Sequence, residues 1–293
     1  MSQPFFDLSR YFARIGYDGP AAPTLDVLRR LHLLHPQAIP FENLDPLTGA
    51  RVALDVPAVV AKLVGRRRGG YCFEQNKLFH AALTQIGFRV TPLIARVRWQ
   101  RPADTATAQT HMLLRVDVDG EAWIADVGFG GVTLTAPLRS TPGVRQTTPH
   151  GVFRLVETEL PDEIVCEFET ANGWQPVYRF SGEPVEWIDY DAANWFTSTF
   201  PDSRFLHDLI ACRVLPDGRA TLVNTVLTVR DGAGHASALR FDDAPAWEAC
   251  LRETLHIDPA GFDVAALFDQ LAVRGDPFTA GAPAASGAAS AQS

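Results

Sequence analysis

Apolar side chains return every three or four residues along the first 87 positions, a spacing typical of helices that pack on one face. The pattern divides into four segments, each bounded by residues that start or stop helices. We therefore predict a helical bundle over residues 1–87. The first helix follows Asp7 and ends at Gly16, the second begins at Thr24 and stops before Pro36, the third has Pro57 in its first turn and closes at Gly65, and the fourth follows Gly69-Gly70 and ends before Gly87.

From Phe88 onward the pattern changes to alternating apolar and polar residues that are rich in β-branched side chains, which is typical of strands. Two dipeptides, Asp119-Gly120 and Asn172-Gly173, separate such runs and are typical of tight hairpin loops. We therefore predict an antiparallel β-barrel over residues 88–200.

The last part of the chain mixes both patterns, which indicates an α/β unit over residues 201–278. Strands are expected at 208–214 and 221–229, with a turn at 216–218, and helices near 247–255 and 264–271. Residues 279–293 are only Ala, Gly, Pro, Ser, Thr and Gln, and we expect this tail to be disordered because it cannot bury enough apolar surface.

Charge and cysteine content narrow the function classes. The 293 residues include 34 Asp and Glu against 26 Lys and Arg, so the clustered basic face of a nucleic-acid binder is not expected. No apolar run approaches the length of a membrane span, and no secretory leader is evident, which favours a cytoplasmic protein. The four cysteines are widely spaced, so neither a structural metal nor a disulfide framework is predicted. Only two basic residues are lysines, Lys62 and Lys77.

Cys72 lies where the local sequence favours a reactive thiol. In the segment RRRGGYCFEQNKLF, two glycines allow a sharp turn, and the thiol then falls in the first turn of the predicted helix. The helix dipole and the arginines at 66–68 both favour a thiolate there. A buried packing role is the alternative for Cys72, and it is the favoured interpretation for Cys166, Cys212 and Cys250.

A base for this thiol is predicted on the first hairpin. If Asp119 and Gly120 form its loop, Leu113 lies opposite Asp126, and His111 becomes a diagonal neighbour of Asp126 on the same face. Diagonal neighbours have Cβ atoms roughly 7–8 Å apart, within reach of an imidazole and a carboxylate. A strand histidine and a loop-capping aspartate would have the same sequence, but together with Cys72 they match the Cys-His-Asp arrangement of nucleophilic catalysis.

Glycines follow Asp126 in the segment Gly128-Phe129-Gly130-Gly131. They allow the backbone to approach a ligand, and Phe129 offers an aromatic face, although a plain turn between strands is also consistent with them. No phosphate-binding GxxxxGK[ST] or GxGxxG motif is present.

Several motifs together resemble the arylamine N-acetyltransferases, in particular their prokaryotic branch. These are IPFENL at 39–44, RGGYCFE at 68–74, TH at 110–111, DVGFG at 126–130, NWFTSTFPDSRF at 194–205 and PDGRATLVN at 216–224. The resemblance implies an α+β fold with a cysteine-protease-like core related to papain and transglutaminase, made of a helical bundle, a β-barrel and an α/β lid.

The resemblance also implies roles for individual residues. Cys72, His111 and Asp126 would be the catalytic triad, and Glu42 would pair with Arg68 as structural support. The residues expected to line the acceptor pocket are Phe41, Thr110, Phe129, Gly130 and Phe205. The chain departs from the family at Met112, where relatives often carry a polar residue, and the acidic stretch 187–191 has no role that the sequence explains.

The predicted activity is a ping-pong acetylation through acetyl-Cys72. Acetyl-CoA would be the donor, and an aromatic amine or hydrazine, or the oxygen of an N-hydroxyarylamine, would be the acceptor. No metal, prosthetic group, nucleic acid or membrane is expected, and a homo-oligomer is left open. The same triad is compatible with a cysteine hydrolase or an amide synthase. A catalytically silent protein that binds aromatic ligands is a third hypothesis.

Overall fold

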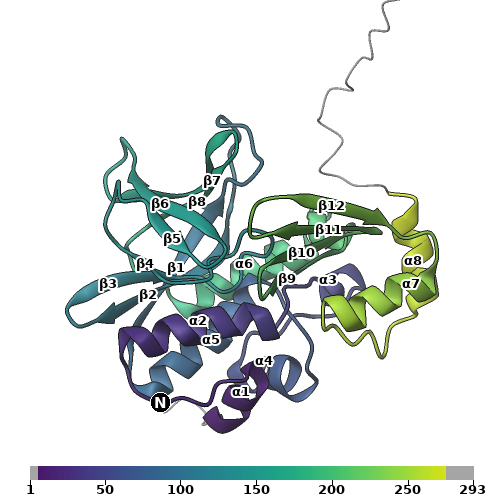
Figure 1. Ribbon diagram of the computed structural model, residues 1–293, viewed down its shortest axis with the longest axis horizontal. Helices are drawn as coiled ribbons and strands as arrows, with labels where there is room; N and C mark the ends of the chain where they lie inside the picture. The colour runs from purple at the N-terminus through teal and green to yellow at the C-terminus, as the bar shows by residue number, and fades with distance from the viewer. Residues whose placement is uncertain (1–5, 275–293) are drawn as a thin grey trace, which may run out of the picture.

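The computed structural model describes residues 6–274, which form a mixed helical and β-sheet protein (Figure 1). The helices are α1 (Leu8–Ile15), α2 (Leu25–Ala38), α3 (Leu44–Leu47), α4 (Val56–Val60), η1 (Ala61–Gly65), α5 (Cys72–Ile86), α6 (Trp187–Thr199), η2 (Arg204–Leu206), α7 (Ala244–Ala249), η3 (Cys250–Thr254) and α8 (Val264–Ala272). The strands are β1 (Arg89–Val97), β2 (Gln109–Val118), β3 (Glu121–Ala125), β4 (Leu138–Arg139), β5 (Gln146–Thr148), β6 (Gly151–Glu157), β7 (Glu163–Thr170), β8 (Gly173–Ser181), β9 (Ile210–Leu215), β10 (Gly218–Val223), β11 (Val226–Asp231) and β12 (Ala236–Arg240).

The predicted N-terminal helices are present, with caps that explain their ends. Asp7 accepts a hydrogen bond from the N–H of Ser9 at the start of α1, and Gly16 ends that helix in the left-handed conformation. Gly87 ends α5 in the same way. The predicted end of α2 at Pro36 is wrong, because the helix continues to Ala38. Pro36 lies in the last turn, where its missing N–H removes a single helical hydrogen bond.

Eight strands form one sheet that curls into a nearly closed barrel, in the order β4-β3-β2-β1-β8-β7-β6-β5 (Figure 1). Its two edges meet through a side chain: the amide of Gln146 on β5 accepts from the backbone N–H of Arg139 on β4 and donates to its carbonyl, at 2.7 and 3.0 Å. Leu113, Phe153 and Cys166 are among the side chains that fill the barrel. The barrel predicted from alternation is therefore confirmed in its strands.

The first hairpin has the predicted register. Val118 pairs with Glu121 across the Asp119-Gly120 loop, and Leu114 pairs with Ala125. The second hairpin differs by one residue, because Gly173 already pairs with Thr170 and the loop is Ala171-Asn172. Gly173 has a φ of 97°, a conformation that glycine adopts at low cost.

Two further predictions of secondary structure are wrong. Residues 187–199 form α6 within the region predicted to be sheet. The sequence shows no apolar stripe for this helix, because its buried face includes Asn194 and Thr197. Residues 221–229 do not form one strand: β10 and β11 pair directly across Asn224-Thr225. Asn224 has a φ of 53°, which asparagine tolerates better than most residues.

The C-terminal sheet, β12-β11-β10-β9, lies beside the barrel and packs against α7 and α8. Its core also contains Leu44 and Leu47 of α3. A backbone bridge between Phe41 and Cys212 links the two regions. Within residues 6–274, no helix is both long and apolar enough to cross a membrane. The predicted tail, 279–293, lies outside the described residues.

Candidate active site

A tight turn places Cys72 at the first residue of α5. A Cβ added at Gly69 would lie 2.3 Å from the carbonyl oxygen of Pro40, so only glycine fits there. Glu74 then accepts from the N–H of Tyr71 at 3.1 Å, which fixes the start of the helix. The Cys72 thiol is nearly buried, and its Sγ lies 3.5 Å from the carbonyl oxygen of Thr110 on β2.

Five charged residues form an ion-pair network behind this turn: Glu42, Asp45, Lys62, Arg68 and Glu74. Arg68 donates to Glu42 at 2.7 and 3.0 Å and to Asp45 at 3.1 Å. Lys62 contacts Asp45 at 2.6 Å and Glu74 at 2.8 Å. Burial alone would lower the pKa of Lys62, but the carboxylates raise it above its usual range. The Arg68 charge is thus directed at carboxylates rather than at the thiol.

His111 and Asp126 are brought together by the hairpin. His111 Nε2 lies 2.7 Å from Asp126 Oδ2, and both side chains are buried. Burial opposes the charged imidazole, yet the Asp126 charge and hydrogen bonds to Asp126 and Cys72 raise the His111 pKa to about 10. The Asp126 pKa is lowered despite its burial, chiefly by His111. Since Nε2 is occupied by Asp126, Nδ1 is the ring nitrogen left for the thiol.

Asn76 connects the two halves of the site, although sequence reasoning missed it. Its amide donates to Asp126 Oδ1 at 3.0 Å and to the carbonyl of Met112 at 2.7 Å, and it accepts from the N–H of Val127 at 3.1 Å. A signal was available, because Asn76 follows Cys72 by four residues and therefore lies on the same side of the helix.

His32 is a second contact that the sequence did not indicate. Its Nε2 accepts from the backbone N–H of Asp126 at 3.1 Å. Burial lowers the His32 pKa to about 4, although the Asp126 charge opposes this, so the ring is neutral and free to accept. His32 lies on α2, 94 residues from Asp126, and no spacing in the sequence relates the two.

The glycine segment after Asp126 packs directly on Cys72. A Cβ added at Gly128 would lie 2.9 Å from the Cα of Cys72. Gly130 has a φ of 91°, and a Cβ there would lie 3.4 Å from the ring of Phe41. The close approach to Cys72 therefore requires glycine at residue 128, and the positive φ favours glycine at residue 130.

The predicted acceptor residues surround the site from several elements. The ring of Phe129 lies 5.1 Å from that of His111, and the rings of Phe41 and Phe205 lie 6.1 Å apart. Phe205 also contacts Tyr71, at 5.7 Å. Thr110 contributes its carbonyl to the thiol, as described above. Thr110 and Phe129 thus lie against Cys72 and His111, whereas Phe41, Gly130 and Phe205 form a second group toward the C-terminal sheet.

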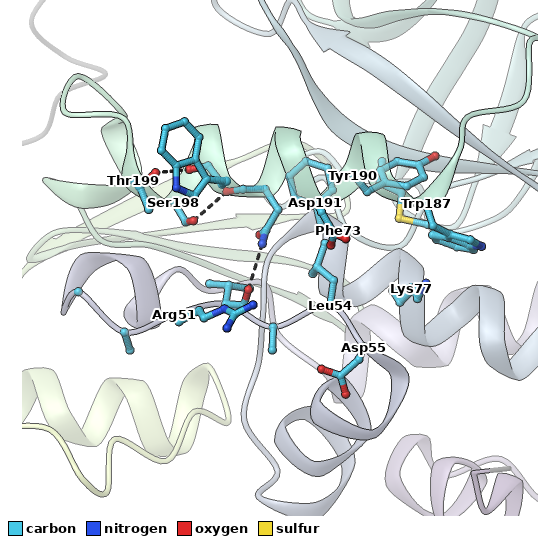
Figure 2. Close-up of a pocket in the computed structure, with 17 residues that line it drawn as sticks. Arg51, Leu54, Asp55, Phe73, Lys77, Trp187, Tyr190, Asp191, Ser198 and Thr199 are labelled. Atoms are coloured by element: carbon cyan, nitrogen blue, oxygen red, sulfur yellow. Dashed lines mark hydrogen bonds between the residues drawn. The ribbon is translucent and has the colours of Figure 1, made fainter. Parts of the chain in front are cut away.

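Two clefts lie on opposite sides of α6. The larger, of about 730 Å³, is lined by Phe73, Lys77 and Met112 together with α6 and residues 49–55 (Figure 2). The smaller, of about 470 Å³, includes Thr110 and apolar residues of α6. Phe73 and Met112 directly follow Cys72 and His111, so the larger cleft is next to the site without including either residue.

The remaining cysteines are buried and carry no comparable partners. Burial raises the pKa of Cys212 to about 12 and that of Cys250 to about 11, and it raises the pKa of Cys166 above its usual range. All four cysteines are free thiols. Among residues 6–274, no group of three or more His, Cys, Asp and Glu side chains is placed to hold a metal ion.

A thiol at a helix start, facing a buried His–Asp pair, defines the class of enzymes that use a cysteine nucleophile. Comparison with known proteins narrows this class. The model of the N-acetyltransferase family matches residues 24–261. Together with the relatives below, this match shows that the chain belongs to the arylamine N-acetyltransferase family.

The relatives are similar over most of their length. The arylamine N-acetyltransferase of Escherichia coli K12 is 44% identical over 91% of this chain and 94% of that protein. A Salmonella typhimurium protein named arylamine N-acetyltransferase / N-hydroxyarylamine O-acetyltransferase is 44% identical over 84% of this chain and 87% of that protein. The structure of the Mycobacterium marinum arylamine N-acetyltransferase in complex with CoA superposes with a TM-score of 0.86. It is 39% identical in sequence and covers 90% of this chain and 98% of that one.

Proposed function

We propose that this protein transfers the acetyl group of acetyl-CoA to aromatic amines and hydrazines, and to the oxygen of N-hydroxyarylamines, through acetyl-Cys72. The observation that carries the proposal is the buried chain of contacts from Cys72 through His111 to Asp126. The named activities of the relatives and the CoA complex of one of them support the choice of donor and acceptor. Because the nucleophile is a thiolate, we place the protein in the reducing cytoplasm.

In the first half reaction, the Cys72 thiolate attacks the thioester carbonyl of acetyl-CoA. A His111 pKa of about 10 favours the imidazolium at neutral pH, and this charge stabilises the thiolate. The C–S bond to CoA then breaks, His111 protonates the CoA sulfur, and the acetyl group remains on Cys72. We expect backbone N–H groups at the start of α5, including that of Cys72, to stabilise the tetrahedral oxyanion, because the first N–H groups of a helix have no partner within it.

In the second half reaction, the amine nitrogen attacks acetyl-Cys72, and the C–S bond breaks to release the product and the Cys72 thiolate. His111, now neutral, accepts the amine proton. An arylamine suits this step because its weak basicity leaves it neutral near pH 7. We propose that Phe41, Phe129, Gly130 and Phe205 line the acceptor pocket with Thr110, so that the ring packs on the phenylalanines. Asp126 holds the imidazole in the orientation that both steps need.

We also propose that the site is built on a core related to papain and transglutaminase, with a helical bundle at 1–87, a barrel at 88–200 and a lid at 201–278. The nucleophile at the start of α5 and the base on β2 support this proposal. Glu42 and Arg68 would then hold the turn that precedes the nucleophile, as their contact at 2.7 Å suggests.

Intact-mass measurement tests the mechanism. Wild-type protein mixed with acetyl-CoA should gain one acetyl group on Cys72 and lose it when an arylamine is added. Cys72→Ser should show less than about a thousandth of the wild-type transfer rate. Full activity in that variant would refute the mechanism. Loss of the acetyl group to water as fast as to the amine would favour a hydrolase, and absence of any acetylation would favour a binding protein.

A further inference from the structure

The larger cleft contains an amine that the acetyl-transfer mechanism does not use. Lys77 lies on α5, and its side chain enters the cleft below Trp187 of α6 (Figure 2). Its Nζ is 3.1 Å from the centre of the Trp187 ring. The ring of His80 packs edge-on against that of Trp187, with the ring centres 4.9 Å apart, which holds the indole in place. Lys77 is half-buried, so a small reagent entering the cleft can reach its amine.

No carboxylate within residues 6–274 forms an ion pair with this amine. Asp191 on α6 and Asp55 in the loop before α4 face it at longer range, and both favour its charged form. Burial outweighs them and lowers the Lys77 pKa to about 8. His80, the titratable neighbour on the same helix, is itself neutral near pH 7, because burial lowers its pKa to about 4.

Lys62, the only other lysine of the chain, is a natural control. It is also buried, but Asp45 and Glu74 lie within 2.6 and 2.8 Å of its Nζ. These carboxylates hold the amine charged, and a charged ammonium has no lone pair with which to attack a carbonyl. The same side chain therefore occurs twice, once paired with carboxylates and once beside an indole ring in a cleft, without a carboxylate partner.

We propose that the Lys77 amine is a second acyl-acceptor site of this protein, a modification site that takes acyl groups from thioesters such as acetyl-CoA without passing through Cys72. The neutral amine attacks the thioester carbonyl, an Nζ–C bond forms and the C–S bond breaks. The amine proton goes to the leaving thiolate, so the products are an amide on Lys77 and free CoA. This reaction goes beyond the arylamine transfer proposed above and does not depend on it.

The reactivity of Lys77 depends on the fraction of its amine that is unprotonated. Near pH 7.5 an amine with a pKa of about 8 has roughly two hundred times more free base than an ordinary lysine. A weaker base is also a weaker nucleophile, which removes part of this advantage. We therefore expect a net rate advantage of about tenfold over an ordinary lysine near neutral pH.

Competitive labelling tests the proposal. Full-length Cys72→Ser protein, which cannot form acetyl-Cys72, is incubated with acetyl-CoA at pH 7.5 together with Nα-acetyl-lysine amide as the reference amine. Peptide mapping should find Lys77 acetylated about ten times faster than the reference, with Lys62 slower than both. The advantage of Lys77 should disappear in concentrated urea and shrink above pH 10, where ordinary lysines also lose their proton.

Three outcomes would overturn the proposal: labelling of Lys77 no faster than the reference, equal labelling of Lys62 in the folded protein, or labelling of Lys77 in wild type but not in Cys72→Ser. Lys77→Arg is the matched variant, because it keeps the positive charge beside Trp187. It should lose only the label at residue 77 while the reference and Lys62 react as before.

Discussion

The molecule buries charge in two neighbouring places, with opposite consequences. In the ion-pair network, every charged side chain contacts an opposite charge, and no reactive atom is left. At the proposed active site, the His111–Asp126 pair has similar burial, but one imidazole nitrogen remains for the Cys72 thiol. Residue 74 and residue 76 lie on the same helix and belong to different clusters.

This difference predicts that the ion-pair network acts on stability and that the site acts on the reaction rate. Removing one partner of a buried ion pair leaves a charge without compensation, so a change in the network should reduce stability. A change at the site should reduce the rate while the fold survives, because the surrounding core is apolar and well packed. Four substitutions test this separation, taken from the largest expected effect to the smallest.

Asp126→Asn should cause the largest loss, about a thousandfold to ten-thousandfold in kcat for acetyl transfer. An amide cannot stabilise the His111 imidazolium, so the thiolate of Cys72 should require a higher pH. Steady-state kinetics and the pH profile of Cys72 alkylation by iodoacetamide measure both effects. Asp117→Asn, which removes a half-exposed partner of Arg115 on the same sheet, is the control and should keep near wild-type activity.

Asp126→Asn also tests how the stability of the protein depends on pH. The His111 pKa is raised from 6.5 to about 10, so its contribution is complete below pH 6.5 and is lost as the pH rises through 10. The Asp126 pKa is lowered from 3.8, so its contribution to stability is present above pH 3.8. That contribution is lost as the pH falls through the lowered pKa of the folded protein. Denaturant unfolding from pH 3 to 11 should show this window in wild type. An identical profile in Asp126→Asn would contradict the pairing.

Lys62→Met should have the largest effect on stability, about 3–5 kcal/mol in the free energy of unfolding. It leaves Glu74 buried without a cation, whereas Asp45 keeps its contact with Arg68. The measurement is urea unfolding at pH 7, with kcat determined on the folded fraction. Arg145→Ala removes an exposed ion pair with Glu169 and should leave the unfolding midpoint unchanged. A large drop in kcat without a drop in stability would break the separation between the clusters.

Gly128→Ala should reduce kcat by about a hundredfold, because its Cβ would lie 2.9 Å from the Cα of Cys72 and displace the nucleophile. Gly131→Ala is the matched control. Its Cβ would meet only Thr221 Oγ1, at the ordinary distance of 3.6 Å, and activity should be unchanged. Equal kinetics for the two variants would show that the close approach at residue 128 has no role in catalysis.

Asn76→Ala should have the smallest effect of the four, about tenfold in kcat. It removes hydrogen bonds to Asp126, Met112 and Val127, and so acts through the position of Asp126 rather than on the substrate. If Asn76 is a positioning residue, the pH profile of Cys72 alkylation should shift together with kcat. Thr84→Ala on the exposed side of the same helix should change neither. A loss of stability with an unshifted profile would assign Asn76 a structural role only.

Local patterns in the sequence predicted the parts of the fold that depend on near neighbours. Asp7 begins α1, and Gly16 and Gly87 end α1 and α5, where the residue types require it. The Asp119-Gly120 loop set the hairpin register, and this register placed His111 beside Asp126. These predictions succeeded because capping and tight loops act over a few residues, and the sequence shows them directly.

Local patterns failed where burial is decided by distant segments. The α6 helix buries Tyr190, Asn194 and Thr197, and two of these are polar, because they meet residues from elsewhere in the chain. Asn194, for example, donates to the carbonyl of Val52 across 142 residues. Such a helix has no apolar stripe to detect, since its buried face satisfies hydrogen bonds as well as packing.

The sequence by itself determined the ends of α1 and α5, the register of the first hairpin and the residue types of the site, since each depends on spacing along the chain. Only the tertiary structure decided that Cys72 lies beside the strand of His111 and that His32 contacts Asp126. It also decided that Lys62 meets carboxylates, whereas Lys77 meets the Trp187 ring. The physical reason is that the packing of α2, α5, α6 and the barrel sets these contacts. The charge state of a buried group depends on that packing and not on its neighbours in sequence.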